Sequence, residues 1–317
     1  MAELQSWKYG FNSYGNKPDS QLNLNYTDCC MSDPYLIRNC GGCNPECSFL
    51  LGKATSCDAD LGISPVYPKF GDALANIGGL QWDNIQGRAV DTTSFPSEIN
   101  LVWNNRATIP PEIKQPLAIS PKEVFPSHNI VKGLGCIPVV DVRKKLGLPD
   151  TTRLWLSSGA IDPIIDWMWT NPVEVINAIN INRLEVLISP DFSTYGEQCP
   201  VSWRVSGKKS LILYSEWAQL FPASILTISM PNLFFVEQWA EWFNKNITTN
   251  CVSVNAQTWK SEKLFDSMFD LVGEFRSLVN RELHYIVSGP TTIVRIEKVR
   301  SILPNVTIVS SLHYNAR

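Results

Sequence analysis

Eight short runs of mainly apolar residues recur along the last two thirds of the chain. They cover residues 99–103, 116–120, 154–158, 185–189, 226–230, 251–255, 284–288 and 307–311. Their apolar character is continuous rather than alternating, which is what strands buried on both faces require. Because parallel sheets bury both faces, this pattern predicts a parallel β-sheet.

Segments with helical spacing separate most of these runs. In segments 236–243, 264–278 and 291–303, apolar residues recur at steps of three and four, as on one face of a helix. Segment 171–181 opens with Asn-Pro, and proline suits the first turn of a helix. Strands that alternate with helices imply right-handed crossovers. The sequence therefore predicts an α/β fold in which eight strands close into a (β/α)8, TIM-like barrel, with an open doubly wound sheet as the alternative.

Two early connections fit this pattern least well. Segment 104–115 is too short and too rich in proline for a good helix. Segment 121–152 is long, and we expect one helix in it, at 141–146.

The first 92 residues have a different character. They are rich in Gly, Asn, Pro and Cys and show little sustained periodicity, so we expect an irregular segment tied down by a ligand or by packing. The predicted organisation is a cysteine-rich metal-binding segment at 1–92, followed by the barrel at 93–317.

The chain has nine cysteines, and six of them lie between residues 29 and 57. Three fall within eight residues, Cys40, Cys43 and Cys47, and the glycines between the first two allow the sulfurs to converge. A fourth ligand would be Cys57, Cys30 or Cys29. Thiolates suit zinc or a [4Fe-4S] cluster, and the sequence leaves both open, with unligated thiols as the alternative.

The stretch CGGCNPEC, from Cys40 to Cys47, resembles the inner part of a bacterial ferredoxin cluster motif. That resemblance implies an iron–sulfur cluster. The sequence departs from the motif at two positions: the residue three before Cys40 is Ile37, and the closing proline is Ser48. The segment also resembles the radical-SAM motif in composition only. That motif spaces its cysteines CxxxCxxC, whereas this segment reads CxxCxxxC.

Charge and hydropathy limit the partners to be expected. The formal net charge is −3 and the isoelectric point is near 5.7, so a strongly basic nucleic-acid or membrane surface is not predicted. No stretch reaches the roughly 18 uninterrupted apolar residues of a membrane span, and Met1 to Tyr9 lacks the apolar centre of a signal peptide. We expect a cytoplasmic protein without a membrane partner.

The candidate catalytic residues follow two of the predicted strands. Asp191 and Ser193 come directly after the run 185–189, and Ser157 lies at the end of the run 154–158. In a barrel, active sites lie at the carboxyl ends of the strands, where a carboxylate acts as a general base or holds N–H donors of a substrate. The alternative is that Asp191 caps the following segment.

Further polar residues follow other strands and are the candidate substrate-binding residues. They are Ser158, Gly159, Asn255, Gln257, Ser288, Gly289 and Ser310. Almost all are uncharged hydrogen-bonding types. The mouth of the barrel, meaning its opening at the carboxyl ends of the strands, therefore suits a neutral ligand rich in hydrogen-bond donors and acceptors better than a ligand dominated by phosphate groups.

The segment from about 150 to 317 resembles the tRNA-guanine transglycosylase superfamily, including its DNA-acting phage relatives. The likeness lies in Leu156-Ser157-Ser158-Gly159-Ala160, then Asn171-Pro172, then Ile188-Ser189-Pro190-Asp191. It implies that Asp191 recognises a base. The family's first aspartate is Ser157 here, its nucleophilic aspartate has only Ser310 or Ser311 in its place, and its zinc site follows the barrel instead of preceding it. The chain also resembles uncharacterised barrel proteins of phages and mobile elements.

Three functions are compatible with these patterns. The first is a transglycosylase-like enzyme that acts on a nucleobase, free or within a nucleic acid. The second is an iron–sulfur redox or radical enzyme, and the third is a non-catalytic, metal-stabilised binding protein. The sequence does not indicate the oligomeric state.

Overall fold

The computed structural model describes two compact units. It describes residues Ile77, Trp82, 85–102, 115–125, 139–192, Thr194 and 200–310. One unit comprises Met1–Ile85 with Phe192–Ile212, and the other comprises Gln86–Asp191 with Leu213–Arg317. The predicted boundary after residue 92 depends largely on residues outside the described ranges and stays a prediction.

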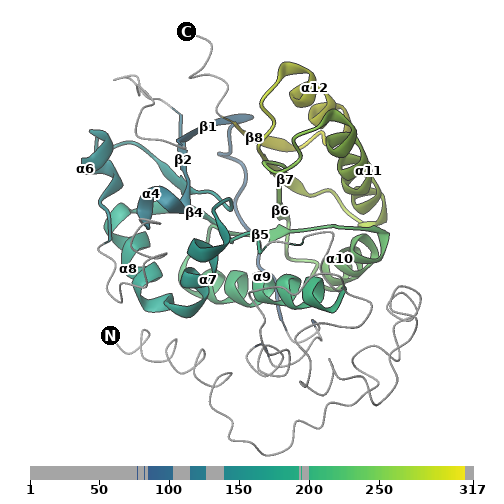
Figure 1. The fold of residues 1–317 in the computed structure, drawn as a ribbon, viewed down its shortest axis with the longest axis horizontal. Helices are drawn as coiled ribbons and strands as arrows, with labels where there is room; N and C mark the ends of the chain where they lie inside the picture. Colours follow the sequence, from purple (N-terminus) through teal and green to yellow (C-terminus); the bar gives the residue numbers. More distant parts are fainter. Residues whose placement is uncertain are drawn as a thin grey trace, which may run out of the picture. The chain divides into compact units, whose positions relative to one another are not determined.

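The second unit contains a closed barrel of eight parallel strands in which sequence neighbours pair throughout (Figure 1). The strands are β1 (Glu98–Val102), β2 (Leu117–Ile119), β3 (Leu154–Leu156), β4 (Leu184–Ile188), β5 (Ser224–Ile228), β6 (Cys251–Asn255), β7 (His284–Ser288) and β8 (Val306–Ser310). Strand β1 pairs in parallel with β2 on one side and with β8 on the other. The predicted α/β barrel is therefore confirmed, and the alternative of an open sheet is wrong.

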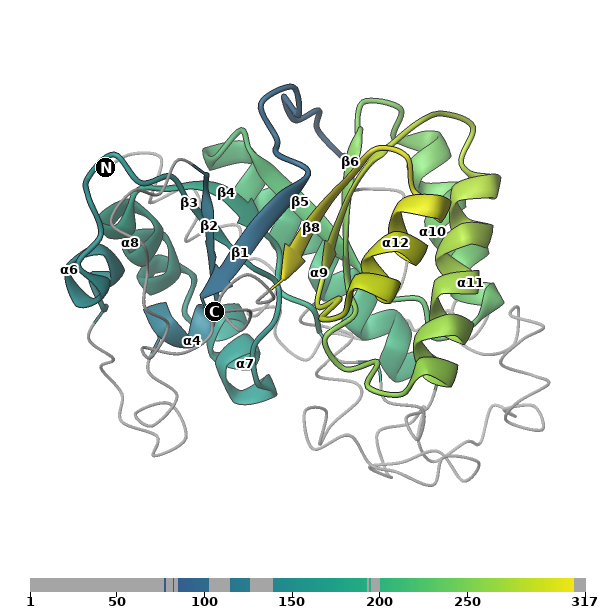
Figure 2. The same cartoon turned by 90° about the horizontal axis from the view of Figure 1, so that it is seen from above.

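Helices connect the strands and surround the barrel. They are α4 (Pro121–Val124), α6 (Val142–Leu146), α7 (Asp162–Thr170), α8 (Pro172–Asn182), α9 (Pro200–Leu220), α10 (Leu233–Lys245), α11 (Glu262–Leu278) and α12 (Ile293–Ile302). Figure 2 shows α10, α11 and α12 on one side of the strands and α6 and α8 on the other. None of the helices in the described part of the chain is long and apolar enough to cross a membrane.

The strand register identifies the inner face of the barrel. Buried apolar side chains from every strand form one cluster, which includes Leu101, Ala118, Trp155, Ile225 and Ile286. Leu101 pairs with Ala118, and Ala118 with Trp155. Residues that pair across parallel strands share a face, and side chains alternate along each strand, so the whole inner face follows from these pairs.

The amino-terminal end of the interior is aromatic and closely packed. The Phe95 ring lies 4.6 Å from the Trp155 ring and 5.4 Å from the His284 ring, measured between centroids. His284 Nε2 lies 2.9 Å from the Thr307 hydroxyl, which donates to the Pro96 carbonyl at 2.6 Å. Burial lowers the pKa of His284. This end of the barrel therefore favours a neutral histidine.

The segment before β1 is fixed to the same end. The Asn250 side chain accepts from the Val90 backbone N–H at 2.8 Å and donates to the Val90 carbonyl at 2.9 Å. Gly87 donates to the Asn246 side chain, and Arg88 to the Tyr214 hydroxyl. Val90 belongs to the interior cluster, so this segment closes the amino-terminal end of the barrel.

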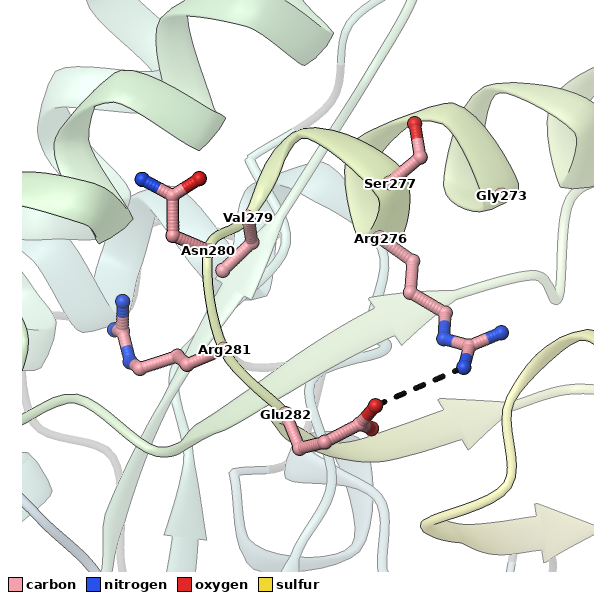
Figure 3. Close-up of a pocket in the computed structure, with 7 residues that line it drawn as sticks. All are labelled: Gly273, Arg276, Ser277, Val279, Asn280, Arg281 and Glu282. Carbon is pink, nitrogen blue, oxygen red and sulfur yellow. Dashed lines mark ion pairs between the residues drawn. The ribbon is translucent and has the colours of Figure 1, made fainter.

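A cleft of about 410 Å³ lies between the end of α11 and the start of β7, also on the amino-terminal side. Figure 3 shows Arg276 and Arg281 on opposite sides of the connecting loop, with Glu282 3.8 Å from Arg276. The Arg281 guanidinium donates to the carbonyls of Phe243, Asn246 and Thr249 at 2.6–3.0 Å. This arginine therefore holds the loop that follows α10.

We predict that Arg281→Met destabilises the barrel by about 3 kcal/mol, because three carbonyl acceptors lose a charged donor. Urea denaturation measures this change. Arg276→Met is the matched control, because Arg276 makes one such bond, to the Ile302 carbonyl, and should cost only about 1 kcal/mol. Equal losses of unfolding free energy in the two variants would contradict the role of Arg281 in holding the loop after α10.

Candidate functional site

Asp191 lies just beyond the carboxyl end of β4 and is held from two sides. The Asn255 amide donates to Asp191 Oδ2 at 3.0 Å, and the Asp191 backbone N–H donates to the Ser158 carbonyl at 3.2 Å. These contacts join the ends of β3, β4 and β6. Helix α9 begins only at Pro200, so Asp191 is not its N-cap. The position of Asp191 at the mouth, which the sequence predicted, is the one observed.

Asn255 is itself fixed in orientation. Its side-chain oxygen accepts from the Gln257 backbone N–H at 3.2 Å, which leaves its nitrogen to donate to Asp191. On the neighbouring strand, Ser288 pairs with Asn255 in the register of β6 and β7. The polar residues predicted at the ends of β3, β4, β6 and β7 therefore form one continuous group.

The Asp191 carboxyl titrates near neutrality. Burial raises its pKa from the ordinary 3.8 to about 7. The hydrogen bond from Asn255 opposes this rise, and the carboxylate of Asp162 adds to it. Asp191 nevertheless keeps part of its surface exposed. A group that is reachable and changes charge near pH 7 can donate or accept a proton in a reaction.

Gly159 and Gly289 lack a side chain where Gln257 approaches them: its side chain lies against Gly159 and its backbone against Gly289. A Cβ on Gly159 would lie 2.3 Å from Gln257 Oε1, so the Gln257 side chain reaches from the end of β6 to the end of β3. Gly289 has a φ of 110°, and a Cβ there would lie 2.5 Å from the Gln257 backbone nitrogen. The predicted residues Gly159 and Gly289 therefore shape the site by close approach of the backbone.

Several hydroxyl groups beneath this group are fully buried. Ser157, Ser158, Ser253 and Ser288 have no exposed surface, and their hydroxyls contact no hydrogen-bond partner among the described residues. Gln257 Nε2 is likewise buried and without a partner there. Burying a hydroxyl without a partner is costly, and such groups in native proteins are usually met by ordered water, an ion or a ligand.

Neighbouring hydroxyls in the same region do have partners. Ser120 donates to the Gly159 carbonyl at 3.0 Å. Thr227 donates to the Ser189 carbonyl at 2.6 Å, and the Ser189 hydroxyl accepts from the Thr227 backbone N–H at 2.9 Å. Among the described residues, paired and unpaired hydroxyls therefore lie side by side at the carboxyl ends of the strands.

Sequence reasoning missed Ser120, Thr227 and Ser253. Thr227 and Ser253 lie within their apolar runs, and Ser120 ends a run, but none of the three was among the predicted site residues. Their signal is the two-residue period: Thr227 and Ser253 lie two residues after the inward-facing Ile225 and Cys251.

Ser310 does not belong to this group. Thr307 pairs with Ile286 and therefore faces the interior, so the alternation along β8 turns Ser310 outward. Ser193 lies outside the described residues. So do Cys30, Cys40, Cys43, Cys47 and Cys57, and the zinc or [4Fe-4S] site stays a prediction. Within the described ranges, no three His, Cys, Asp or Glu side chains are grouped as metal ligands would be.

Comparison with known proteins gives no assignment, since neither a protein-family model nor a curated protein matches the chain. The arrangement of the site is therefore the basis for the function proposed below.

We predict that Ser157→Ala and Ser288→Ala each stabilise the protein by about 1 kcal/mol, because each removes a buried hydroxyl that has no partner. Ser120→Ala is the matched control: this serine is equally buried but paired, and its loss should destabilise by about 1 kcal/mol. Thermal and urea unfolding measure both effects. Destabilisation by all three substitutions would show that the Ser157 and Ser288 hydroxyls have hydrogen-bond partners in the folded protein.

We also predict that Asp191→Asn alters how stability depends on pH. A carboxyl whose pKa is raised on folding stabilises the folded state fully below its unfolded pKa of about 4, and this contribution is lost as the pH rises through about 7. Asparagine keeps an acceptor for Asn255 but carries no charge. The variant should therefore be more stable than the wild type above pH 7.

The measurement is the free energy of unfolding in urea from about pH 4 to about pH 8. Asp150→Asn serves as the control, because this carboxylate is 85% exposed. Parallel pH profiles for the wild type and Asp191→Asn would show that the Asp191 carboxyl is not desolvated.

Proposed function

We propose that the mouth of the barrel is an active site that acts on a nucleobase, free or within a nucleic acid, and that Asp191 exchanges protons with the base. The observation that carries this proposal is a carboxyl at the mouth of the barrel that is oriented by a fixed amide and whose pKa burial raises to about 7. Such a carboxyl donates a hydrogen bond below that pH and accepts one above it.

The surroundings of Asp191 favour an uncharged ligand. Asn255 and Gln257 contribute amides, which match the donors and acceptors along the edge of a base. Gln257 Nε2 is a donor that lacks a partner among the described residues. A base that presents an acceptor to Gln257 and a ring nitrogen to Asp191 would use both groups.

The arrangement favours acid–base chemistry over a serine nucleophile. A hydroxyl nucleophile needs a base within hydrogen-bonding reach, and the Ser157 hydroxyl has no partner among the described residues. Proton donation from Asp191 to a ring nitrogen would let the base leave as a neutral molecule while water or an incoming base forms the new bond to the sugar carbon, and this base–sugar bond is the one that a transglycosylase exchanges. In this proposal Ser157 lines the site and does not attack the substrate.

Binding of free adenine, guanine, cytosine and uracil to the full chain, measured by calorimetry, tests the proposal. We expect one base to bind, and Asp191→Asn to weaken its affinity at least about tenfold, because the ionisable partner is lost. The affinity of the wild type should change between pH 6 and pH 8, and that of Asp191→Asn should not. Asp150→Asn, whose carboxylate is exposed, should bind normally.

Absence of binding by every base, or equal binding by Asp191→Asn and the wild type, would overturn the proposal. Binding that depends on Asp191 but leads to no change in the base or in its bond to sugar would favour the non-catalytic alternative.

A further inference from the structure

The interior of the barrel changes character along its axis. Towards the amino-terminal end it is filled by Phe95, Trp155 and neighbouring apolar side chains. Towards the carboxyl ends the inward positions carry hydroxyls: Ser157 beyond β3, Ser253 on β6 and Ser288 at the end of β7. These three face inward because each lies two residues after a member of the interior cluster: Trp155, Cys251 and Ile286.

The three serines lie at the same end of the barrel as the group around Asp191. Ser288 pairs with Asn255, which donates to Asp191, and Ser253 lies on the same strand and face as Asn255. Ser157 adjoins Ser158, whose carbonyl accepts from the Asp191 backbone. The unpaired hydroxyls therefore lie at the same end of the barrel as Asp191, although they themselves have no accessible surface.

Gln257 reaches across the same end of the barrel, from the end of β6 to Gly159 just after β3. Its backbone is fixed by Asn255 and by the close approach of Gly289, whereas its side chain rests against Gly159. Gln257 Nε2 has no partner among the described residues, so moving the amide breaks no hydrogen bond of that nitrogen. The Asn255 oxygen and Gly289 thus hold the Gln257 backbone, whereas no hydrogen bond from the described residues holds the Nε2 end of its side chain.

We propose that Ser157, Ser253 and Ser288 form a second, deeper subsite, and that the Gln257 side chain closes it. The ligand group that enters is small and uncharged, with both donors and acceptors, such as a hydroxyl, carbonyl or amide. Between His284 and Asp191, the inward positions of the described strands carry no charged side chain, and a buried charge without a partner is costly. The subsite rests on the proposed function, because it receives a substituent of the base bound at Asp191.

Thiol labelling of a Ser288→Cys variant of the full chain tests this subsite without a ligand. The reagent is methyl methanethiosulfonate, which is small and neutral, and peptide mass spectrometry reports the modification at each position. Cys251 is the internal control: it lies on the inner face two residues before Ser253, is buried, and should react only on global unfolding. If Ser288→Cys does not fold, Ser157→Cys replaces it.

We expect position 288 to be labelled in the folded protein while Cys251 stays unmodified. If the open state is a minor one of about 0.1–10%, adding Gln257→Ala should speed labelling at position 288 by roughly tenfold or more. Gly159→Ala should do the same, because its new methyl group would displace the Gln257 amide. Labelling of 288 and Cys251 at equal rates, no labelling in any variant, or no effect of Gln257→Ala would overturn the proposal.

A second arm separates this inference from the proposed function. Labelling is repeated with saturating adenine, guanine, cytosine or uracil. A base that slows labelling at position 288 supports both proposals. Selective, Gln257-dependent labelling that no base slows supports the subsite and counts against a nucleobase as its ligand.

Discussion

The pairing of β8 with β1 is the constraint on which the rest of the structure depends. Ile99 and Asn100 pair with Val309 and Ser310, and the Ile308 backbone N–H donates to the Ser97 carbonyl at 2.9 Å. Closure removes both edges of the sheet and converts one of its faces into an enclosed interior. Asp191 follows β4 and Asn255 ends β6, two strands that lie on either side of β5, and both residues lie at the carboxyl ends of the strands that surround this interior.

The sequence predicted the strands well, because a parallel barrel demands continuous apolar runs. Strands β1, β4 and β8 begin one residue before their predicted runs, and β5 begins two residues before, at Ser224. Ser224 is buried and polar, and its hydroxyl donates to the Phe221 carbonyl, so hydrophobicity alone does not mark it. Three connecting helices, α4, α7 and α9, were not predicted. Each has a proline in its first turn, the same signal that identified α8.

The sequence predicted which site residues follow the ends of strands, but it did not predict which of their side chains point into the barrel. Asp191, Asn255 and Gln257 follow strands, and that position alone places them at the mouth. Which serines enter the interior depends on register: Ser288 faces inward and Ser310 outward, although each ends a strand. The raised pKa of Asp191 also depends on burial by residues distant in sequence, which spacing along the chain does not encode.

The unpaired hydroxyls have a consequence for how such a chain can change over generations. Replacing Ser157 or Ser288 by alanine is a single conservative step, and it relieves a penalty that the folded barrel otherwise carries. Selection for thermal stability alone would therefore replace these serines early, and the result would be a more stable barrel without the proposed activity. Persistence of the serines in a lineage would indicate that something other than folding maintains them.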